Sequence, residues 1–131
     1  MTDLLIDKAI SLRGYLNQIN LKADQNSNNV TLATTSVMNP LEKACRTCVE
    51  MGENFLVEHN LNAGKETHQI FDKLVEEKVI ESSLSRRLLS LISYGKLLSQ
   101  ASRIKGKNCQ VKLNQRHLED MHTFTQNLLL S

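Results

Sequence analysis

The sequence predicts an all-α protein, built as an antiparallel bundle of about five helices. Apolar residues recur at spacings of three and four along five separate segments, which is the pattern of amphipathic helices. The chain has five glycines and one proline in 131 residues, so few positions interrupt long helices. No segment carries a strand signal. This length favours a single domain over residues 1–131 with one modest core.

Residues 3–22 form the first expected helix. Its apolar stripe is Leu5, Ala9, Leu12, Leu16 and Ile19. Asp3 and Asp7 suit the positive end of the helix dipole. The next residues, ADQNSNN at 23–29, have no periodicity and predict a polar linker.

Residues 30–60 form the second long segment, whose start is open to two interpretations. Its apolar face holds Leu41, Ala44, Cys45, Cys48, Val49, Gly52, Phe55 and Leu56. Asn39 could cap a helix that has Pro40 at its first position and Glu42 at its third, as in a capping box. Alternatively, the helix begins near Thr31 and kinks at Pro40. We favour the continuous, kinked helix, although the β-branched and polar residues of VTLATTSV make its first turn weak.

The fourth segment organises the rest of the chain. Residues 65–78 precede it as a third helix, with Ile70 and Leu74 facing inward. Ser82 and Ser83 can cap the fourth helix, which runs to about Ser102. Its stripe at helical spacing is Leu84, Leu88, Leu91, Ile92, Gly95 and Leu98.

A basic loop, IKGKNCQVKL at residues 104–113, separates the fourth helix from the fifth. Asn114 is the expected cap of the fifth helix. The final apolar stripe is Leu118, Met121, Phe124 and Leu128.

Charge is distributed unevenly along the chain. The net charge is +2, but residues 82–118 hold eight bases and no acid. One interpretation is a solvated basic face. The other is an anion site for RNA, a nucleotide or an acidic partner. The residues expected to bind the anion are Arg86, Arg87, Lys96, Arg103, Lys105 and Lys107.

Several classes of site are not expected. Cys45 and Cys48 lie three apart on one helix face, but a metal site needs further ligands, and neither Cys109 nor the four histidines supply a second pair. We therefore expect no metal and no cofactor, and we interpret the two thiols as helix-packing residues. The chain lacks a P-loop, G-x-G-x-x-G and H-E-x-x-H. Reduced thiols, no membrane span and no signal peptide predict a cytoplasmic protein.

Four stretches carry a resemblance to a known family: LEKACRTCVEMGENFLVEHNL, FDKLVEEKVI, SLSRRLLSLISYGKLLSQ and RHLEDMHTFTQNLL. Together they are similar to the HepT-like branch of the HEPN domains, and the resemblance covers nearly the whole chain. It implies a small helical homodimer encoded beside a minimal nucleotidyltransferase. In that branch the HEPN protein looks like an RNA-cutting toxin whose antitoxin is the nucleotidyltransferase.

The functional motif of that family departs from this sequence at every position. The motif is Arg-Asn, three residues, His, one residue, Tyr, near the end of the fourth helix. Without a gap, its members fall at Gly95, Lys96, Gln100 and Ser102. An imidazole can move protons near neutral pH and a guanidinium can hold a phosphate, but an amide can do neither. The resemblance therefore implies a catalytically degenerate member.

Three functions remain open from the sequence. The first, which we favour, is a degenerate HEPN protein that acts by binding a nucleotidyltransferase, RNA or a nucleotide. The second is an active ribonuclease that uses other residues, for which Arg116, His117 and His122 are the local candidates. The third is a helical scaffold with no role in nucleic-acid biology. We also expect a homodimer, because Leu89, Tyr94 and Leu97 lie outside the main stripe of the fourth helix.

Overall fold

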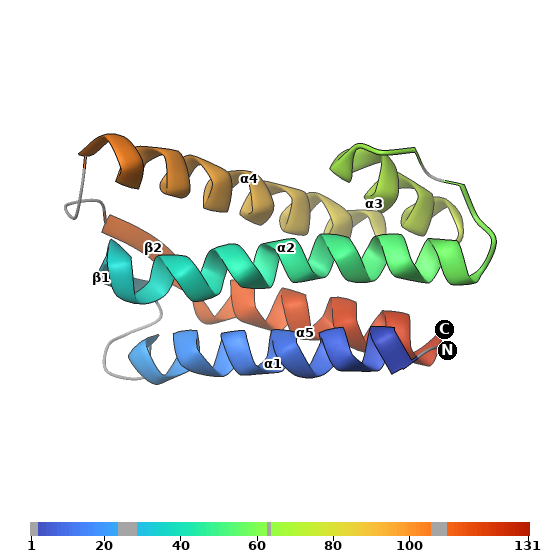
Figure 1. The fold of residues 1–131 in the computed structure, drawn as a ribbon, viewed down its shortest axis with the longest axis horizontal. Helices are drawn as coiled ribbons and strands as arrows, with labels where there is room; N and C mark the ends of the chain where they lie inside the picture. The colour runs from blue at the N-terminus through green and yellow to red at the C-terminus, as the bar shows by residue number, and fades with distance from the viewer. Residues whose placement is uncertain (1–2, 24–28, 63, 106–109) are drawn as a thin grey trace.

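The computed structural model describes residues 3–23, 29–62, 64–105 and 110–131 of the chain. It contains five helices and two short strands (Figure 1). The helices are α1 (Asp3–Ala23), α2 (Thr34–Glu58), α3 (Thr67–Glu76), α4 (Ser82–Lys105) and α5 (Gln115–Leu130). The all-α class and the count of five helices are confirmed.

Helix α2 lies at the centre of the bundle and packs against each of the other four helices. In Figure 1, α4 runs above α2, α1 lies along the opposite side, and α5 passes behind them. The short helix α3 sits beside the beginning of α4. Both ends of the described chain lie at the end of the bundle opposite the strands (Figure 1). None of the helices in the described ranges is long and apolar enough to cross a bilayer.

The core consists mainly of the apolar stripes that the sequence predicts, although Ala9 and Val49 are only partly buried. All the apolar residues of the α4 stripe are buried: Leu84, Leu88, Leu91, Ile92 and Leu98. Phe71 on α3 and Phe124 on α5 are fully buried and stack with their ring centroids 5.4 Å apart. This aromatic contact packs the short helix α3 against α5.

A two-stranded antiparallel ladder closes one end of the bundle and was not expected from the sequence. Strand β1 (Asn29–Ala33) pairs with β2 (Gln110–Asn114), so that Asn29 lies opposite Asn114. The ladder joins the α1–α2 connection to the α4–α5 connection. Its sequences, NVTLA and QVKLN, contain β-branched residues that favour extended backbone.

Three boundaries in the structure differ from the predicted ones. Helix α2 begins at Thr34 and not near Thr31, because residues 31–33 belong to β1. Helix α4 continues to Lys105, past the predicted end at Ser102. The end of the predicted basic loop is strand β2. The prediction that α2 continues through Pro40 is confirmed, since this proline lies inside the helix.

Helix α3 is shorter than the predicted span of 65–78. It begins at Thr67, where the Glu66 backbone N–H donates to Gln69 Oε1 at 3.0 Å. It ends at Glu76, and Lys78 has a positive φ of 61° that no α-helix residue adopts. The positive φ of Lys78 turns the chain from α3 toward α4.

Two helical glycines give a matched test of packing. A Cβ at Gly52 would lie 3.1 Å from Ile70 Cγ2 and 3.2 Å from Leu74 Cδ1, whereas a Cβ at Gly14 meets nothing within 4 Å. Gly14→Ala is expected to stabilise the protein by about 1 kcal/mol through helix propensity. The same change at Gly52 also crowds the α2–α3 contact, which typically costs about 1–3 kcal/mol.

Urea denaturation of both variants therefore should place Gly52→Ala about 1–3 kcal/mol below Gly14→Ala in free energy of unfolding. Equal stabilisation by the two substitutions would show that α2 and α3 do not approach as closely as the structure has them.

Candidate functional site

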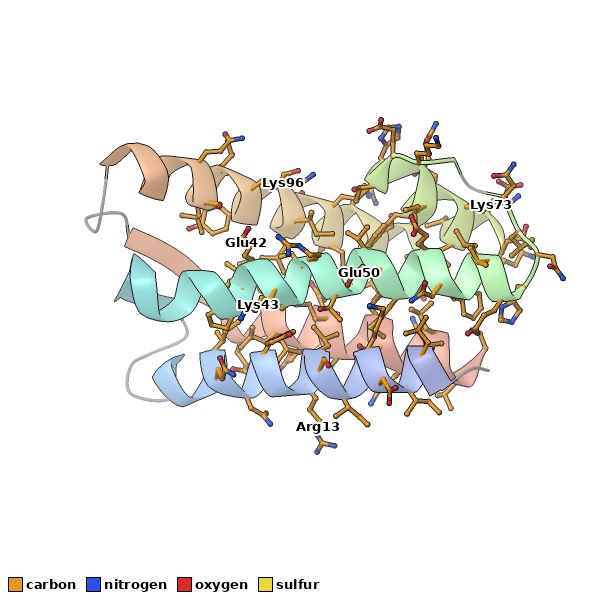
Figure 2. The ribbon with its side chains drawn as sticks, viewed as in Figure 1. Arg13, Glu42, Lys43, Glu50, Lys73 and Lys96 are labelled. Atoms are coloured by element: carbon orange, nitrogen blue, oxygen red, sulfur yellow. The ribbon has the colours of Figure 1, made fainter. Side chains whose placement is uncertain are left out.

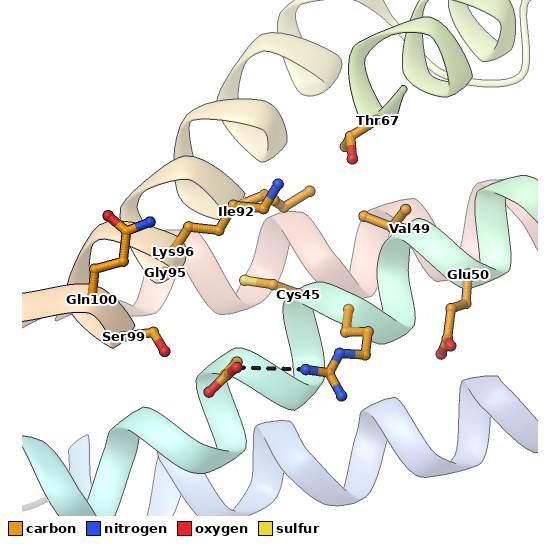
Figure 3. A pocket seen from close by; sticks show the side chains of 11 residues that line it. Cys45, Val49, Glu50, Thr67, Ile92, Gly95, Lys96, Ser99 and Gln100 are labelled. Carbon is orange, nitrogen blue, oxygen red and sulfur yellow. Dashed lines mark hydrogen bonds and ion pairs between the residues drawn. The ribbon is translucent and has the colours of Figure 1, made fainter. Parts of the chain in front are cut away.

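A hollow between α2 and α4 collects three of the four motif positions. We call it the α2–α4 hollow, and its volume is about 360 Å³. Its lining is Glu42, Cys45, Arg46, Val49 and Glu50 from α2, Thr67 from α3, and Ile92, Gly95, Lys96, Ser99 and Gln100 from α4. Figure 3 shows Lys96 and Gln100 on α4 across from Cys45 on α2.

The geometry of α4 explains why the motif positions meet there. Residues 92, 95, 96, 99 and 100 repeat at spacings of three and four, so they share one face of the helix. Gly95 is buried, and a Cβ there would lie 3.4 Å from Cys45 Sγ. Lys96 and Gln100 are exposed at the rim. The side chain of Ser102, the fourth motif position, lies outside the described part of the structure.

The rim of the α2–α4 hollow carries both signs of charge. Arg46 Nη2 lies 3.5 Å from Glu42 Oε1, and Lys8 Nζ from α1 lies 3.2 Å from Glu50 Oε1. These pairs are solvent-accessible, so each adds little to stability. Figure 2 shows Lys96 on α4 and Glu42 and Glu50 on α2. In the close-up of Figure 3 the Glu50 side chain points away from Lys96. The hollow thus has a mainly apolar floor and a rim of mixed charge.

The two thiols of α2 are suited to packing. Burial raises the pKa of Cys45 to about 12, with a smaller contribution from the nearby Glu42 carboxylate. Burial also raises the pKa of Cys48 well above its usual value. Both shifts favour the protonated thiol near neutral pH, and the thiolate is the nucleophilic form of cysteine. In the described ranges, no group of three or more Cys, His, Asp or Glu residues is placed to hold a metal ion.

A second depression lies between α4 and α5, on another side of α4. We call it the α4–α5 groove, and its volume is about 710 Å³. Its lining is Arg86, Arg87, Ser90, Leu91 and Tyr94 from α4, with Arg116, His117 and Asp120 from α5.

One charged pair anchors the α4–α5 groove. Arg87 Nε donates to Asp120 Oδ2 at 3.0 Å, and Arg87 Nη2 donates to Asp120 Oδ1 at 3.2 Å. The hydrogen bond to the carboxylate raises the pKa of Arg87 further above its usual value. Asp120 itself is only 7% exposed, so the pair ties α5 to α4 at a fixed angle. Partial burial lowers the pKa of His117, against an opposing effect of Asp120.

The structure divides the basic residues that the sequence grouped into one anion site. Arg86 and Arg87 line the α4–α5 groove, whereas Lys96 lines the α2–α4 hollow. Arg87 and Lys96 are nine residues apart, which is two and a half helical turns and places them on opposite faces. The side chains of Arg103 and Lys105 lie outside the described part of the structure, and so does all of Lys107.

The α4–α5 groove contains residues that sequence reasoning assigned elsewhere or missed. Arg116 and His117, named as candidates for an alternative ribonuclease, lie in it with Arg86 and Arg87, but His122 does not line it. Asp120 was not singled out. Its position two residues after the end of the acid-free segment was the available signal, but its contact with Arg87 spans 33 residues and is set by the packing of α5 on α4.

Comparisons with known proteins find similarity in structure. No family model and no curated protein matches the sequence. A tri-AMPylated HEPN toxin from Shewanella oneidensis, solved in complex with MNT antitoxin, aligns over 100% of both chains with a TM-score of 0.74 and 16% identity. A toxin–antitoxin solved with AMP-PNP aligns over 98% of this chain and 99% of that chain, with a TM-score of 0.75 and 18% identity.

A third solved structure agrees with these two. A mutant of a MntA–HpeT toxin–antitoxin aligns over 99% of this chain and 100% of that chain, with a TM-score of 0.73 and 16% identity. The agreement extends over the full length of each chain, including all five helices. The chain therefore has the fold of the HEPN toxins, the fold that its sequence resemblance implied.

Proposed function

We propose that this chain is a catalytically degenerate HepT-like protein, which acts by binding a small nucleotidyltransferase of the MNT class. Two of its structural neighbours are named as HEPN or toxin chains in MNT or MntA complexes, and they match this chain over its whole length. The degenerate assignment is carried by one observation. Where the family motif has arginine and histidine, the α2–α4 hollow has the buried Gly95 and the exposed Gln100.

The chemistry of the hollow supports binding and not cleavage. Metal-independent RNA cleavage needs a group that exchanges protons near neutral pH, and none of the described residues that line the hollow is a histidine. Its thiol, Cys45, stays protonated because of its raised pKa of about 12. Lys96 can attract an anion but lacks the bidentate fork of arginine.

The partner proposal is tested by co-purification from the native host. An affinity-tagged copy of the chain is expected to retain a small protein with nucleotidyltransferase sequence motifs, identified by mass spectrometry. Retention should survive nuclease treatment, because the contact is between proteins. If no nucleotidyltransferase is retained from a host that expresses one beside this gene, the partner proposal is wrong.

We also propose that RNA binds along the last turns of α4, through Lys96, Arg103 and Lys105, with Lys107 following. Arg86 and Arg87 lie apart from Lys96, because they line the α4–α5 groove. Binding to single-stranded RNA should weaken steeply as salt rises, because it releases counterions. If filter binding at low salt detects no RNA on the wild type, this basic stretch is a solvated surface. A cytoplasmic location fits all of these partners and belongs to the same proposal.

The two alternatives make different demands on the structure. An active ribonuclease would have to use the α4–α5 groove, where Arg116 and His117 lie together. A pure scaffold would need neither basic site. An assay of RNA cleavage by the wild type distinguishes the active ribonuclease from the degenerate protein. Co-purification and RNA binding distinguish the scaffold from a protein that acts by binding.

A further inference from the structure

The floor of the α2–α4 hollow is apolar and has room for a small ligand. Cys45 and Ile92 are each only 5% exposed there, and Val49 is partly buried beside them. Gly95 adds no side chain to the floor. The volume of about 360 Å³ lies in the lower part of the range for small-molecule sites. Apolar ligand atoms on this floor would be removed from water, which favours binding.

One cation at the hollow keeps its charge available for a ligand. The carboxylate of Glu42 is paired with Arg46, and the carboxylate of Glu50 is paired with Lys8 from α1. Among the residues that the structure describes, Lys96 forms no ion pair. Three bases therefore stand against two acids at this site, which leaves a surplus of one positive charge at Lys96.

The direction of the Lys96 side chain brings this charge to the apolar floor. A helical side chain leans toward the N-terminal end of its helix, so Lys96 extends toward Ile92, one turn earlier on α4. Figure 3 shows this direction. Ser99 and Gln100 add neutral hydrogen-bonding groups to the same lining.

The surplus of one charge distinguishes between classes of anion. A carboxylate carries one negative charge at neutral pH, whereas a phosphate monoester carries about 1.5–2. The second charge of a phosphate would meet the carboxylates of Glu42 and Glu50, which line the same hollow. A single carboxylate therefore matches the charge of the site better than a phosphate does.

From this arrangement we propose that the α2–α4 hollow binds a small carboxylic acid with an apolar body. Its carboxylate pairs with Lys96, and its body lies on the floor between Val49 and Ile92. This ligand contains neither a nucleobase nor a phosphate, so the proposal goes beyond the protein partner and the RNA proposed above. The floor lies below the charged rim, so a second copy packed on the rim would enclose the ligand and not displace it.

The test is calorimetric titration of the purified full chain at low salt with butanoate, hexanoate and octanoate. Affinity is expected to rise about fourfold for each methylene group that the hollow buries. Octanol has a similar body without the charge, and acetate has the charge with almost no body, so both should bind more weakly than octanoate. Each titration is made at two temperatures, because burial of apolar surface makes the heat of binding depend on temperature.

Two substitutions in the hollow test the two parts of the site. Lys96→Gln should weaken octanoate binding by about 10-fold or more, because it removes a charge-assisted hydrogen bond. Lys96→Arg should lose less, since it keeps the charge. Gly95→Leu should abolish binding, because its Cβ would lie 3.4 Å from Cys45 Sγ and the rest of the side chain would fill the floor.

The same two substitutions elsewhere in the chain serve as matched controls. Lys65→Gln removes the charge of an exposed lysine that does not line the hollow. Gly14→Leu adds the same side chain at a glycine of α1 where a Cβ meets nothing within 4 Å. Both controls should bind octanoate as the wild type does, and the melting temperature of each variant shows whether it is folded.

Three outcomes would overturn the proposal. They are no heat of binding with octanoate at either temperature, octanol that binds as tightly as octanoate, and octanoate affinity that falls as much in Lys65→Gln as in Lys96→Gln. None of them bears on retention of a nucleotidyltransferase or on filter binding of RNA, which are measured separately.

Discussion

The purified wild-type protein is expected to leave single-stranded RNA intact in the presence of a chelator. General acid–base catalysis by one positioned side chain typically contributes about 10²–10⁴-fold, and Gln100 stands at the α2–α4 hollow where the family motif has its histidine. The measurement is the fraction of a fluorescently labelled RNA that is cut, compared with a mock purification from cells that lack the gene.

A restored motif should reverse this result. The restored variant carries Gly95→Arg, Lys96→Asn, Gln100→His and Ser102→Tyr. We expect it to fold, because a Cβ added at position 95 would lie 3.4 Å from Cys45 Sγ, which is an ordinary contact distance. Gly95→Arg also removes a helix-weakening glycine. The new guanidinium and imidazole would both border the hollow, and chelator-resistant cleavage or toxicity on expression should appear.

The matched control keeps Gln100 and changes only the other three positions. It retains the arginine but lacks the imidazole, so its cleavage should fall about 10²–10⁴-fold below that of the full variant. Chelator-resistant cleavage by the wild type that is lost in His117→Ala would contradict the degenerate assignment. The active site would then lie in the α4–α5 groove, where His117 lies beside Arg116.

Periodicity alone predicted the core and the number of helices. The stripe of α4 is buried as expected, because a spacing of three and four fixes one helix face whatever the partners are. The β1–β2 ladder was not predictable in the same way. Each strand has only five residues, and its stability depends on a pairing between segments about 80 positions apart, which no local pattern encodes.

The candidate sites were predicted in part. The shared face of residues 95, 96 and 100 follows from helical spacing. The separation of Arg87 from Lys96 follows from it too, so the prediction of one anion site for all the bases was wrong for these two residues. The Arg87–Asp120 pair could not be predicted, since it depends on the angle at which α5 packs on α4. The Lys8–Glu50 pair at the rim of the α2–α4 hollow depends likewise on the packing of α1 beside α2.

We propose that the chain is a symmetric homodimer through the side of the bundle that carries the α2–α4 hollow. Glu42, Arg46 and Glu50 follow one another along α2 at spacings of four, and Lys96 lines the same hollow from α4. The ion pairs of Glu42 with Arg46 and of Glu50 with Lys8 are solvent-accessible, so these groups can exchange partners across an interface. A two-fold axis would bring the acids of one copy to the bases of the other. Next to Gln100, Leu97 is 64% exposed on the outer face of α4 and offers apolar area to such a contact.

Light scattering of the wild type at micromolar concentration should therefore give the mass of a dimer, and Leu97→Glu should give a monomer. A charge left unpaired in an interface costs about 2–5 kcal/mol, so the dissociation constant should rise roughly 30-fold or more. Leu130→Glu is the control, because Leu130 is 86% exposed at the end of α5, far along the chain from the hollow. The Leu130→Glu variant exchanges the same pair of residue types outside the proposed interface, so it should remain dimeric. A wild type that scatters only as a monomer, or a dimer that Leu97→Glu leaves intact, would show that this side of α4 is not the interface.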